Sequence, residues 1–382
     1  MEKKKVKIKV ANNKQEATTV GQWLDLWLEN YVRPGIRQST YEIYRAHLNN
    51  HLLPRLGHFQ LDELSAADIQ FFLRDLQING NQKSQGHGLA SSTIVCIRNL
   101  LKTALEQAVY EGKIARNPAR QTKPPKVEMQ EMNVLTQEEV RSFLQQSTNS
   151  RYYAAYVLTL TTGVRRGEVL GLSWRSVYLG IPWGLLDNQL PWKKIAKLPR
   201  WDTEALGKLI KRKHIQLRTD PFIMITQQLS DLRSGPQLTM PKTRRSQRIT
   251  GIPMDTALML IFQRCIQKQE KKTVSSDYNP QDLVFCDNKG QPLHPRHFTR
   301  LFQNDLKQSG IKKVRFHDLR HTVATMLLED GKAINTVQEI LGHYNPAFTA
   351  SQYGHVTTRM QQEATETLGL VLKKAREPVS DL

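Results

Sequence analysis

The chain has 382 residues, with 55 lysines and arginines against 35 aspartates and glutamates, and its formal net charge at pH 7 is +20. Such an excess favours a polyanionic partner, nucleic acid ahead of a membrane surface, over a soluble protein that is merely basic. There is no apolar run of about 18 residues and no apolar stretch after the lysine-rich start, so a membrane-spanning or secreted protein is excluded and a cytoplasmic one is expected.

The three cysteines, Cys96, Cys265 and Cys286, lie far apart in the chain and lack the spacing of metal ligands. They predict neither a disulfide framework nor a zinc site. We therefore expect a reducing interior and no bound metal.

In residues 1–18, lysines alternate with Val6, Ile8 and Val10. A short strand and a disordered basic arm account for this alternation equally well. Either way, the segment is expected to precede the first domain as a basic arm.

Residues 19–118 show helical periodicity and predict a compact bundle of four helices. Ser65 and Asp68 have the spacing of a capping box at the start of one helix. The longest helix is predicted to begin at Ser91 or Ser92 and to end near Gly112. Because the apolar residues should pack inside the bundle, only its polar face remains to contact a partner.

Duplex DNA suits that polar face, because a bundle without chemistry of its own would hold DNA through phosphate contacts. The candidate contacts are polar and basic side chains near the starts of two predicted helices. They are Gln38, Ser39, Thr40, Arg45, His87, Ser91 and Ser92.

Residues 119–133 contain the adjacent prolines Pro124 and Pro125 and no apolar period. This composition predicts an extended linker, which would let two domains close around DNA. Beyond it, Thr136 and Glu139 form a second capping box at the start of a helix.

A predicted buried helix at residues 152–160 is followed by the motif TTGVRRGE at residues 161–168. Arg165 would stand at the start of the next helix, where its guanidinium and the free backbone amides can bind an anion together. An isolated Arg-Arg pair is usually just solvated, so this motif gains weight only beside the C-terminal motif described below.

Residues 183–220 hold nine lysines and arginines between Lys193 and Arg218. Trp192 and Trp201, each near a proline, indicate local order. A DNA-contacting lobe, a protein contact and a solvated surface loop all fit this composition.

Three strand patterns follow, at residues 222–229, 237–243 and 248–253. Lys242 ends the second pattern just before a basic turn with Arg244 and Arg245. Lysines in such turns are mostly solvated, so this pattern alone assigns Lys242 no role. Further on, Asp255 is expected to cap a helix and residues 283–285 to form a short strand.

Polar motifs are most concentrated between residues 316 and 356. His317 and Arg320 stand three residues apart, so both can reach one small anion from one face of a helical turn. Arginine donates in pairs to phosphate oxygens, and histidine exchanges a proton near neutral pH. Gly342 is predicted to end the following helix and to hold His343 at its end. A tyrosine hydroxyl beyond that point could attack phosphorus.

These motifs carry a resemblance to a known family. The H-x-x-R pair, the Leu-Gly-His at residues 341–343 and Tyr353 ten residues later resemble the signature of the tyrosine recombinase, or phage integrase, family. TTGVRRGE is similar to that family's T-G-x-R-x-G-E box, and Lys242 resembles its hairpin lysine. The resemblance covers residues 19–180 and 222–375, so residues 183–220 form a possible insertion.

The resemblance implies a nucleophile and the groups that stabilise its attack. Tyr353 would attack a DNA phosphate to form a 3′-phosphotyrosyl bond and release a 5′ hydroxyl. Arg165 and Arg320 would neutralise the transition-state oxygens, and His343 would add a hydrogen bond. Tyr344, adjacent to His343, is expected to be a packing or surface residue.

The resemblance also implies the proton transfers. His317 would act as general base towards the tyrosine, and Lys242 as general acid towards the leaving 5′ oxygen. Glu168 would orient the site or balance its charge from behind. Because the covalent link conserves the bond energy, neither a metal nor another cofactor is implied.

The implied fold is mainly α-helical with a small β-sheet: a helical core-binding domain joined by a linker to an α+β catalytic domain. We expect a basic arm at 1–18, the core-type DNA-binding domain at 19–118, the linker at 119–133, the catalytic domain at 134–363 with the possible insertion at 183–220, and a C-terminal helix and tail at 364–382. The tail would contact a neighbouring protomer. The implied partners are DNA core sites, further copies of the chain in a homo-tetramer, and an accessory directionality factor.

The function that follows is site-specific recombination, with integration and excision of a mobile element such as a conjugative transposon or prophage. A dimer resolvase of the same chemistry is an alternative, although the linker, the insertion and the chain length favour the integrase. The Leu-Gly-His box and the helical N-terminal domain disfavour a type IB topoisomerase. A non-catalytic DNA-binding relative should lack one of the six side chains, yet all six are present.

Overall fold

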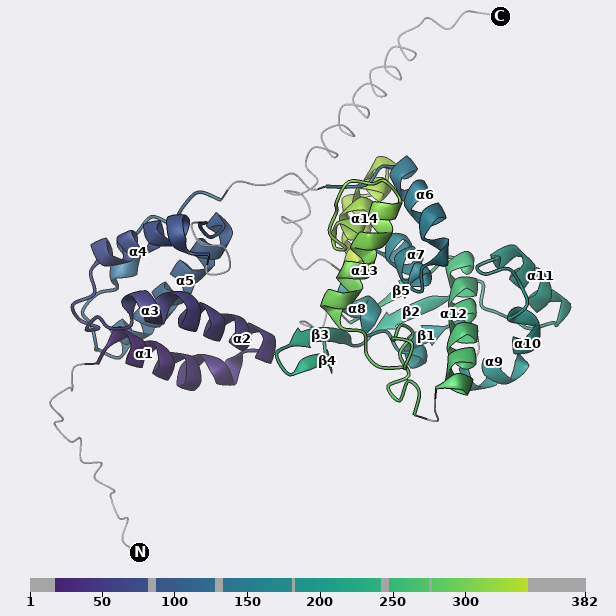
Figure 1. The fold of residues 1–382 in the computed structure, drawn as a ribbon, viewed down its shortest axis with the longest axis horizontal. Coiled ribbons are helices and arrows are strands. Elements are labelled where there is room, and N and C mark those ends of the chain that lie inside the picture. Colours follow the sequence, from purple (N-terminus) through teal and green to yellow (C-terminus); the bar gives the residue numbers. More distant parts are fainter. Residues whose placement is uncertain are drawn as a thin grey trace, which may run out of the picture. The chain divides into compact units, whose positions relative to one another are not determined.

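The computed structural model describes residues 18–81, 87–127, 133–180, 183–241, 247–274 and 277–342 (Figure 1). The chain divides into two compact units, Met1–Gln130 and Glu131–Leu382, and each is described by itself. The expected fold class, mainly α with a small β-sheet, is confirmed.

In its described part, the first unit consists of four continuous helical segments, as its periodicity predicted. They contain α1 (Val20–Trp27), α2 (Gln38–His47), α3 (Leu53–Leu56), α4 (Ala66–Asn79) and α5 (Ser91–Tyr110). Short π-helical and 3₁₀ turns extend α1 to residue 35 and join α2 to α3. The indole Nε1 of Trp23 donates to the carbonyl of Ala104 at 2.9 Å, which fixes α1 against α5 inside the core.

Local capping interactions set the helix starts that the sequence predicted. The Ser65 hydroxyl accepts from the amide of Asp68 at 3.2 Å, and the Asp68 carboxylate accepts from the amide of Ser65 at 3.0 Å. Thr136 and Glu139 form the same reciprocal pair at the start of the second unit's first helix. Each pair satisfies two backbone donors that a helix terminus would leave free.

The second unit combines helices with short strands. Its elements are α6 (Gln137–Gln146), α7 (Tyr153–Thr162), α8 (Arg166–Leu170), β1 (Val177–Tyr178), α9 (Trp183–Gln189), α10 (Trp192–Ile195), α11 (Thr203–Arg212), β2 (Phe222–Ile225), β3 (Gln228–Leu232), β4 (Gly235–Thr239), β5 (Arg248–Gly251), α12 (Met254–Thr273), α13 (Pro295–Gln308), α14 (Asp318–Glu329) and α15 (Ile334–Leu341).

Two small antiparallel sheets occur in the described part of this unit. One has the order β1-β2-β5, and the other is the β3–β4 hairpin, which lies between β2 and β5 in the chain. Ile225 pairs with Arg248, so Arg248 stands at the end of the β2–β5 ladder. The predicted strand at 248–253 is confirmed with shorter bounds, whereas the predicted strand at 222–229 is divided between β2 and the start of β3, which belong to different sheets, and β4 begins at Gly235, two residues before the predicted start.

Helix α7 lies in the middle of the core and is buried along most of its length. Aromatic rings of α6 and α13 surround Tyr156: its centroid lies 5.2 Å from that of Phe143 and 5.7 Å from that of Phe302. The Tyr156 hydroxyl donates to Asp305 at 2.7 Å, so its polar end is satisfied. α14 and α12 both pack on this helix, which gives the end of α7 a rigid setting.

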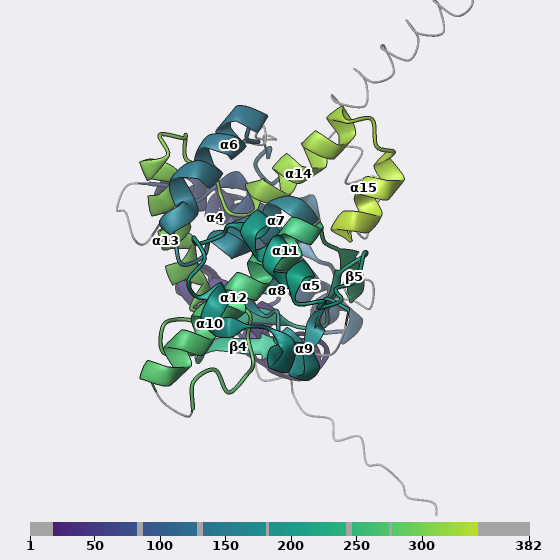
Figure 2. The same cartoon turned by 90° about the vertical axis from the view of Figure 1, so that its right-hand side faces the viewer.

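Residues 183–220 are not a solvated loop. They contain α9, α10 and α11, which lie beside α12 in both views (Figures 1 and 2). Leu186, Ile195 and Leu206 are buried in the main core of the unit, whereas all nine lysines and arginines of the stretch are exposed. The surface-loop alternative is thus excluded, because burial of these apolar side chains makes the stretch part of the domain.

Two local predictions are wrong. Asp255 does not cap α12: the N-cap is Pro253, and Asp255 lies in the first turn, where its charge still favours the helix terminus. Residues 283–285 form no strand, because Leu283 makes only an isolated bridge with Ser173.

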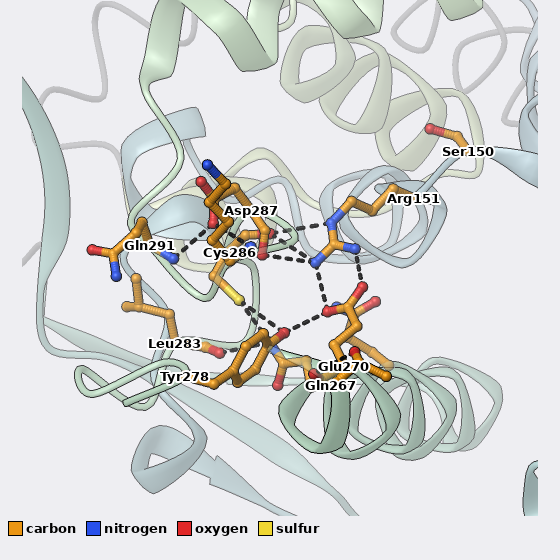
Figure 3. Close-up of polar contacts among 12 residues, drawn as sticks. Ser150, Arg151, Gln267, Glu270, Tyr278, Leu283, Cys286, Asp287 and Gln291 are labelled. Atoms are coloured by element: carbon orange, nitrogen blue, oxygen red, sulfur yellow. Dashed lines mark hydrogen bonds and ion pairs between the residues drawn. The ribbon is translucent and has the colours of Figure 1, made fainter. Parts of the chain in front are cut away.

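A polar network fixes the loop between α12 and α13 (Figure 3). Arg151 forms an ion pair with Glu270 and donates to the carbonyl of Asp287 at 2.9 Å. The Tyr278 hydroxyl donates to the same Glu270 at 2.5 Å and lies 3.6 Å from the buried thiol of Cys286. Burial raises the pKa of that thiol. The network therefore ties this loop to α12 and to Arg151.

Candidate active site

Arg165 is the N-cap residue of α8, directly after a glycine turn. Gly163 ends α7 with φ 63°, and a Cβ atom there would lie 2.3 Å from Cδ2 of Leu341. Glycine thus permits both the left-handed turn and the close approach of α15. Because α8 has five residues, the guanidinium of Arg165, more than the helix terminus, is the group suited to bind an anion.

Glu168 is a buried carboxylate between two arginines. Its Oε1 accepts from Arg165 Nη1 at 2.9 Å and from Arg248 Nη1 at 3.1 Å. Its Oε2 accepts from the Arg165 amide at 2.8 Å and from Arg248 Nη2 at 3.0 Å. Burial alone would raise the pKa of Glu168, but the hydrogen bond and charge of Arg248, and then the charge of Arg165, hold it below its usual value.

Arg320 lies on the first turn of α14 and is buried, with 1% of its surface exposed. Its Nη1 donates to the carbonyl of Gly163 at 2.6 Å, and its Nη2 contacts the carbonyl of Leu341. The expected placement of Arg320 beside His317 at the start of a helix is confirmed. The guanidinium, however, is held by backbone carbonyls from two other segments, which its burial requires.

The two arginines meet at the C-terminal end of α15. Arg165 Nη2 donates to the carbonyl of Gly342 at 3.3 Å, one residue after the Leu341 carbonyl that Arg320 contacts. Gly342 is the C-cap, with φ 63°, and so ends the helix as predicted. Cations complement the partial negative charge of a helix C-terminus, so this arrangement is favourable without any ligand.

His317 is the N-cap residue of α14 and is exposed at the surface. Desolvation, assisted by the charges of His321, Arg320 and Arg165, lowers the pKa of His317 to about 4. Its ring is therefore neutral near pH 7 and able to accept a proton. Arg165, His317 and Arg320, separated by up to 155 residues in sequence, thus act on one place in the fold.

Comparison with known proteins bears on this arrangement. Residues 214–360 match the Phage integrase family, and residues 19–77 match the Phage integrase, N-terminal SAM-like domain. The chain belongs to the phage integrase family of tyrosine recombinases. It is accordingly a tyrosine-type site-specific recombinase.

Individual relatives of this recombinase match along most of their length. The Tyrosine recombinase XerC-like protein of Caldanaerobacter subterraneus subsp. tengcongensis is 28% identical over 360 residues, which cover 92% of this chain and 82% of that protein. The Integrase of Saccharopolyspora erythraea is 26% identical over 376 residues, covering 93% of this chain and 83% of that protein.

One solved structure shows the shared fold. The Tn1549 transposon integrase in complex with transposon right end DNA has a TM-score of 0.65 at 22% identity, covering 92% of this chain and 100% of that chain. At this identity the likeness concerns the fold. The match to the Phage integrase family begins at residue 214, after α9–α11.

Several predicted site residues of the recombinase lie outside the described residues. They are Lys242, Arg244, Arg245, His343 and Tyr353. Lys242, Arg244 and Arg245 fall in the gap between residues 241 and 247. His343 and Tyr353 come after Gly342, the last described residue.

The predicted DNA-contact residues of the first unit have different surroundings. Gln38, His87 and Ser92 are exposed, whereas Ser39, Thr40 and Ser91 are half-buried. Arg45 forms ion pairs with Asp25 and, at 2.5 Å, with Glu29. Both terminal nitrogens of Arg45 thus contact carboxylates, so a contact with DNA would require these pairs to be exchanged.

Sequence reasoning missed Arg248. It stood among many basic residues of a strand, and its partner Glu168 lies 80 residues away, so no local pattern joins them. Within the described residues, no three His, Cys, Asp or Glu side chains are grouped so that they could hold a metal ion. No helix in the described ranges is long and apolar enough to span a membrane.

Proposed function

We propose that this recombinase cuts and rejoins DNA through a phosphotyrosyl intermediate on Tyr353 and so integrates and excises a mobile genetic element. The observation that carries the proposal is the meeting of Arg165 and Arg320 at the end of α15, one residue before His343, with His317 at the start of the same helix as Arg320 and near enough for both charges to lower its pKa. Two guanidiniums beside a neutral imidazole are suited to a phosphodiester under nucleophilic attack.

The proposed reaction forms a bond from Tyr353 Oη to phosphorus and breaks the bond from phosphorus to the 5′ oxygen. The tyrosine proton passes to His317, which is neutral at pH 7 because of its lowered pKa. Lys242 donates a proton to the leaving 5′ oxygen. In the reverse direction, the 5′ hydroxyl of another strand attacks the phosphotyrosine and restores a DNA strand.

Three further groups would stabilise the negative charge that develops on the phosphorane-like transition state. Arg165 and Arg320 would bind the non-bridging oxygens, and His343 would donate one more hydrogen bond. Glu168 would hold Arg165 from the side away from the substrate, through its capping contact and ion pair.

We also propose the division of labour along the chain. Residues 19–118 would grip the core site, with Gln38, Ser39, Thr40, Arg45, His87, Ser91 and Ser92 on the DNA side, assisted by Arg244 and Arg245 of the second unit. Residues 119–133 would link this domain to the catalytic domain at 134–363. The arm at 1–18 would add phosphate contacts, and the tail at 364–382 would contact a neighbouring protomer.

Four protomers would act together, because an exchange between two duplexes breaks four strands and each break requires one tyrosine. An accessory protein would set the direction between integration and excision. Since the substrate is chromosomal or element DNA, the proposed place of action is the cytoplasm.

The test uses duplexes that the full chain selects from a random-sequence library, each prepared with one nick at a different position. The chain is incubated with them in EDTA, and covalent adducts are separated on a denaturing protein gel. We expect an adduct with the wild type and with Tyr344→Phe, and none with Tyr353→Phe. A wild type that binds a selected duplex but forms no adduct at any nick position would contradict the proposal.

A dimer resolvase of the same chemistry is the second candidate, and the XerC-like relative at 28% identity favours it. Strand exchange distinguishes the two. An integrase joins two different attachment sites, whereas a resolvase recombines two identical sites within one molecule. Recombination of two copies of the selected site in one plasmid, without any second site, would favour the resolvase.

A further inference from the structure

The ion-pair cluster around Glu168 contains one more cation than the proposed reaction uses. The Glu168 side chain is 2% exposed, that of Arg248 is 9% exposed and that of Arg165 is 35% exposed. Arg165 is therefore the member that can face a substrate, while Arg248 lies behind it in the protein.

Both carboxylate oxygens of Glu168 accept two hydrogen bonds each. Each carboxylate oxygen of Glu168 accepts one bond from Arg248 and one from Arg165, through either its guanidinium or its backbone amide. Arg248 binds with two parallel N–H donors, the geometry that fits a carboxylate best. The carboxylate therefore has a second full partner besides Arg165.

The second partner of Glu168 changes the electrostatic field that Arg165 can exert on a phosphate. A carboxylate 2.9 Å from Nη1 of Arg165 would by itself cancel much of the field that this guanidinium exerts on a phosphate. With Arg248 present, the cluster of two guanidiniums and one carboxylate has a net charge of +1. The exposed arginine can then act on a substrate as an uncompensated cation.

Arg248 is also held in place from several sides. It pairs with Ile225 in the sheet, and its Cδ lies 3.0 Å from the position a Cβ atom would take at Gly342. Strand β5, helix α8 and the end of α15 thus converge on this one side chain. In Figure 2, β5 and α15 accordingly lie next to each other.

We propose that Arg248 is a positioning residue for the recombination reaction: it neutralises Glu168, so that Arg165 meets the scissile phosphate with its full charge. This inference rests on the proposed role of Arg165 at the phosphate. It assigns to Arg248 no contact with DNA, which separates it from the surface arginines and lysines of the chain.

A charge cycle with the nicked duplexes tests the proposal. Arg248→Gln should slow adduct formation at saturating protein roughly 100-fold, the order expected when one charged donor to the transition state is lost. Its Kd for the same duplex should change less than about 3-fold, because one site contributes little to a binding energy spread over many phosphates. Arg248→Gln combined with Glu168→Gln should recover about 10-fold of the rate, because the uncompensated carboxylate is gone.

If the role of Arg248 is purely structural, the rate should not recover in the double variant. If Arg248 only supports the fold, the double variant should be no faster than Arg248→Gln, and this result would overturn the proposal. Arg151→Gln is the matched control, since Arg151 is also partly buried against a carboxylate, Glu270, but belongs to the network that fixes the loop after α12. Its adduct rate per folded molecule should stay within about 2-fold of the wild type.

Arg248→Lys provides a second arm in case Arg248→Gln does not fold. It keeps the charge and loses the bidentate geometry, so its adduct rate should stay within about 10-fold of the wild type. A folded Arg248→Lys that forms adduct more than 100-fold slower, or a folded Arg248→Gln with the wild-type rate, would overturn the inference alone. A wild type without any adduct would overturn the proposed function, and this inference with it.

Discussion

At the scale of single residues, two ionisable groups of the site respond to desolvation in different ways. Glu168 remains a carboxylate because two guanidiniums and a backbone amide occupy its oxygens. Desolvation of His317, assisted by the charges of His321, Arg320 and Arg165, outweighs the opposing charge of Asp318, so the ring gives up its proton instead. The same positive surroundings that would bind a phosphate therefore also prepare the imidazole as a base.

The pKa of His317 predicts how stability depends on pH. Its folded-state pKa of about 4 lies below that of an exposed histidine, roughly 6.5, so the unfolded chain binds more protons between these values. Its contribution to stability is therefore present above pH 6.5 and is lost as the pH falls towards 4. On going from pH 7 to pH 5, the His317→Gln variant should therefore lose about 1 kcal/mol less unfolding free energy than the wild type. This is less than the whole pKa shift would give, because solvent screens an exposed side chain.

Urea unfolding of the full chain at the two pH values measures this difference. His297→Gln serves as control, because His297 is an exposed histidine of α13. The control should lose as much stability on acidification as the wild type. A His317→Gln variant that loses as much stability as the control would contradict the lowered pKa of His317.

At the scale of elements, helix ends decide where the functional groups stand. Glycine ends α7 before Arg165 and ends α15 before His343, in both cases with a φ of 63°. Capping boxes at Ser65 and Thr136 begin α4 and α6. Helix α11 is positioned differently: Leu206 and Ile210 are buried in the main core beside α12 and hold it there.

Gly331 follows α14 and Gly342 follows α15, and alanine substitutions at both positions test how tightly the end of α15 is packed. Gly331 has φ 79° and open space where a Cβ would lie, while a Cβ at Gly342 would lie 3.0 Å from Cδ of Arg248. Gly331→Ala should cost about 1 kcal/mol of unfolding free energy for its left-handed backbone. Gly342→Ala should cost roughly 1 kcal/mol more, because Arg248 is fixed by its two bonds to Glu168 and yields poorly.

Denaturant unfolding of both alanine variants measures the difference. Gly342→Ala should also slow adduct formation, since it disturbs the backbone just before His343. Equal losses of stability in the two variants would show that Arg248 moves aside freely.

At the scale of the whole molecule, the net charge of +20 is the dominant feature for binding. Each of the two units has a hydrophobic core of its own, so the basic residues are free to occupy surfaces. In residues 183–220, the carboxylates of Glu204 and Asp220 pair with Lys208 and Arg218, so they add little negative charge to that surface.

Salt should therefore control the affinity for non-specific duplex DNA. If the chain neutralises about six phosphates, its affinity should fall on the order of 10³-fold between 50 and 200 mM salt, through the release of counterions. Fluorescence anisotropy with a labelled random-sequence duplex measures the slope of log affinity against log salt concentration. A slope near zero would show that the charge is not used for phosphate contacts.

Much of this protein was predictable where the interactions are local. The capping boxes, the start of α5 at Ser91, the glycine stop at Gly342 and the spacing of His317 from Arg320 all depend on residues within a few positions of one another. Residue types and their spacing also identified the family, because the chemistry of phosphate transfer limits which side chains can serve.

The two failures of the sequence predictions have different physical reasons. Asp255 stood at a plausible cap, but Pro253, with its extended backbone, provides the actual start of α12. Leu283 lacked a neighbouring strand, so its apolar run became a buried loop held by Gln267 and Asn279. The first outcome was decided locally, by a residue two positions away, and the second by what the fold placed beside Leu283.

The sequence by itself therefore determined most helices outside residues 183–220, several of their ends, the order of the motif residues and the basic character that suits DNA, since these follow from local geometry and composition. Tertiary structure alone decided that Arg248 shares Glu168 with Arg165, that Arg320 is buried against the carbonyls of Gly163 and Leu341, and that residues 183–220 join the core. The physical reason is burial: removing a charge or an apolar face from water requires a partner, and the partners came from segments far away in the chain.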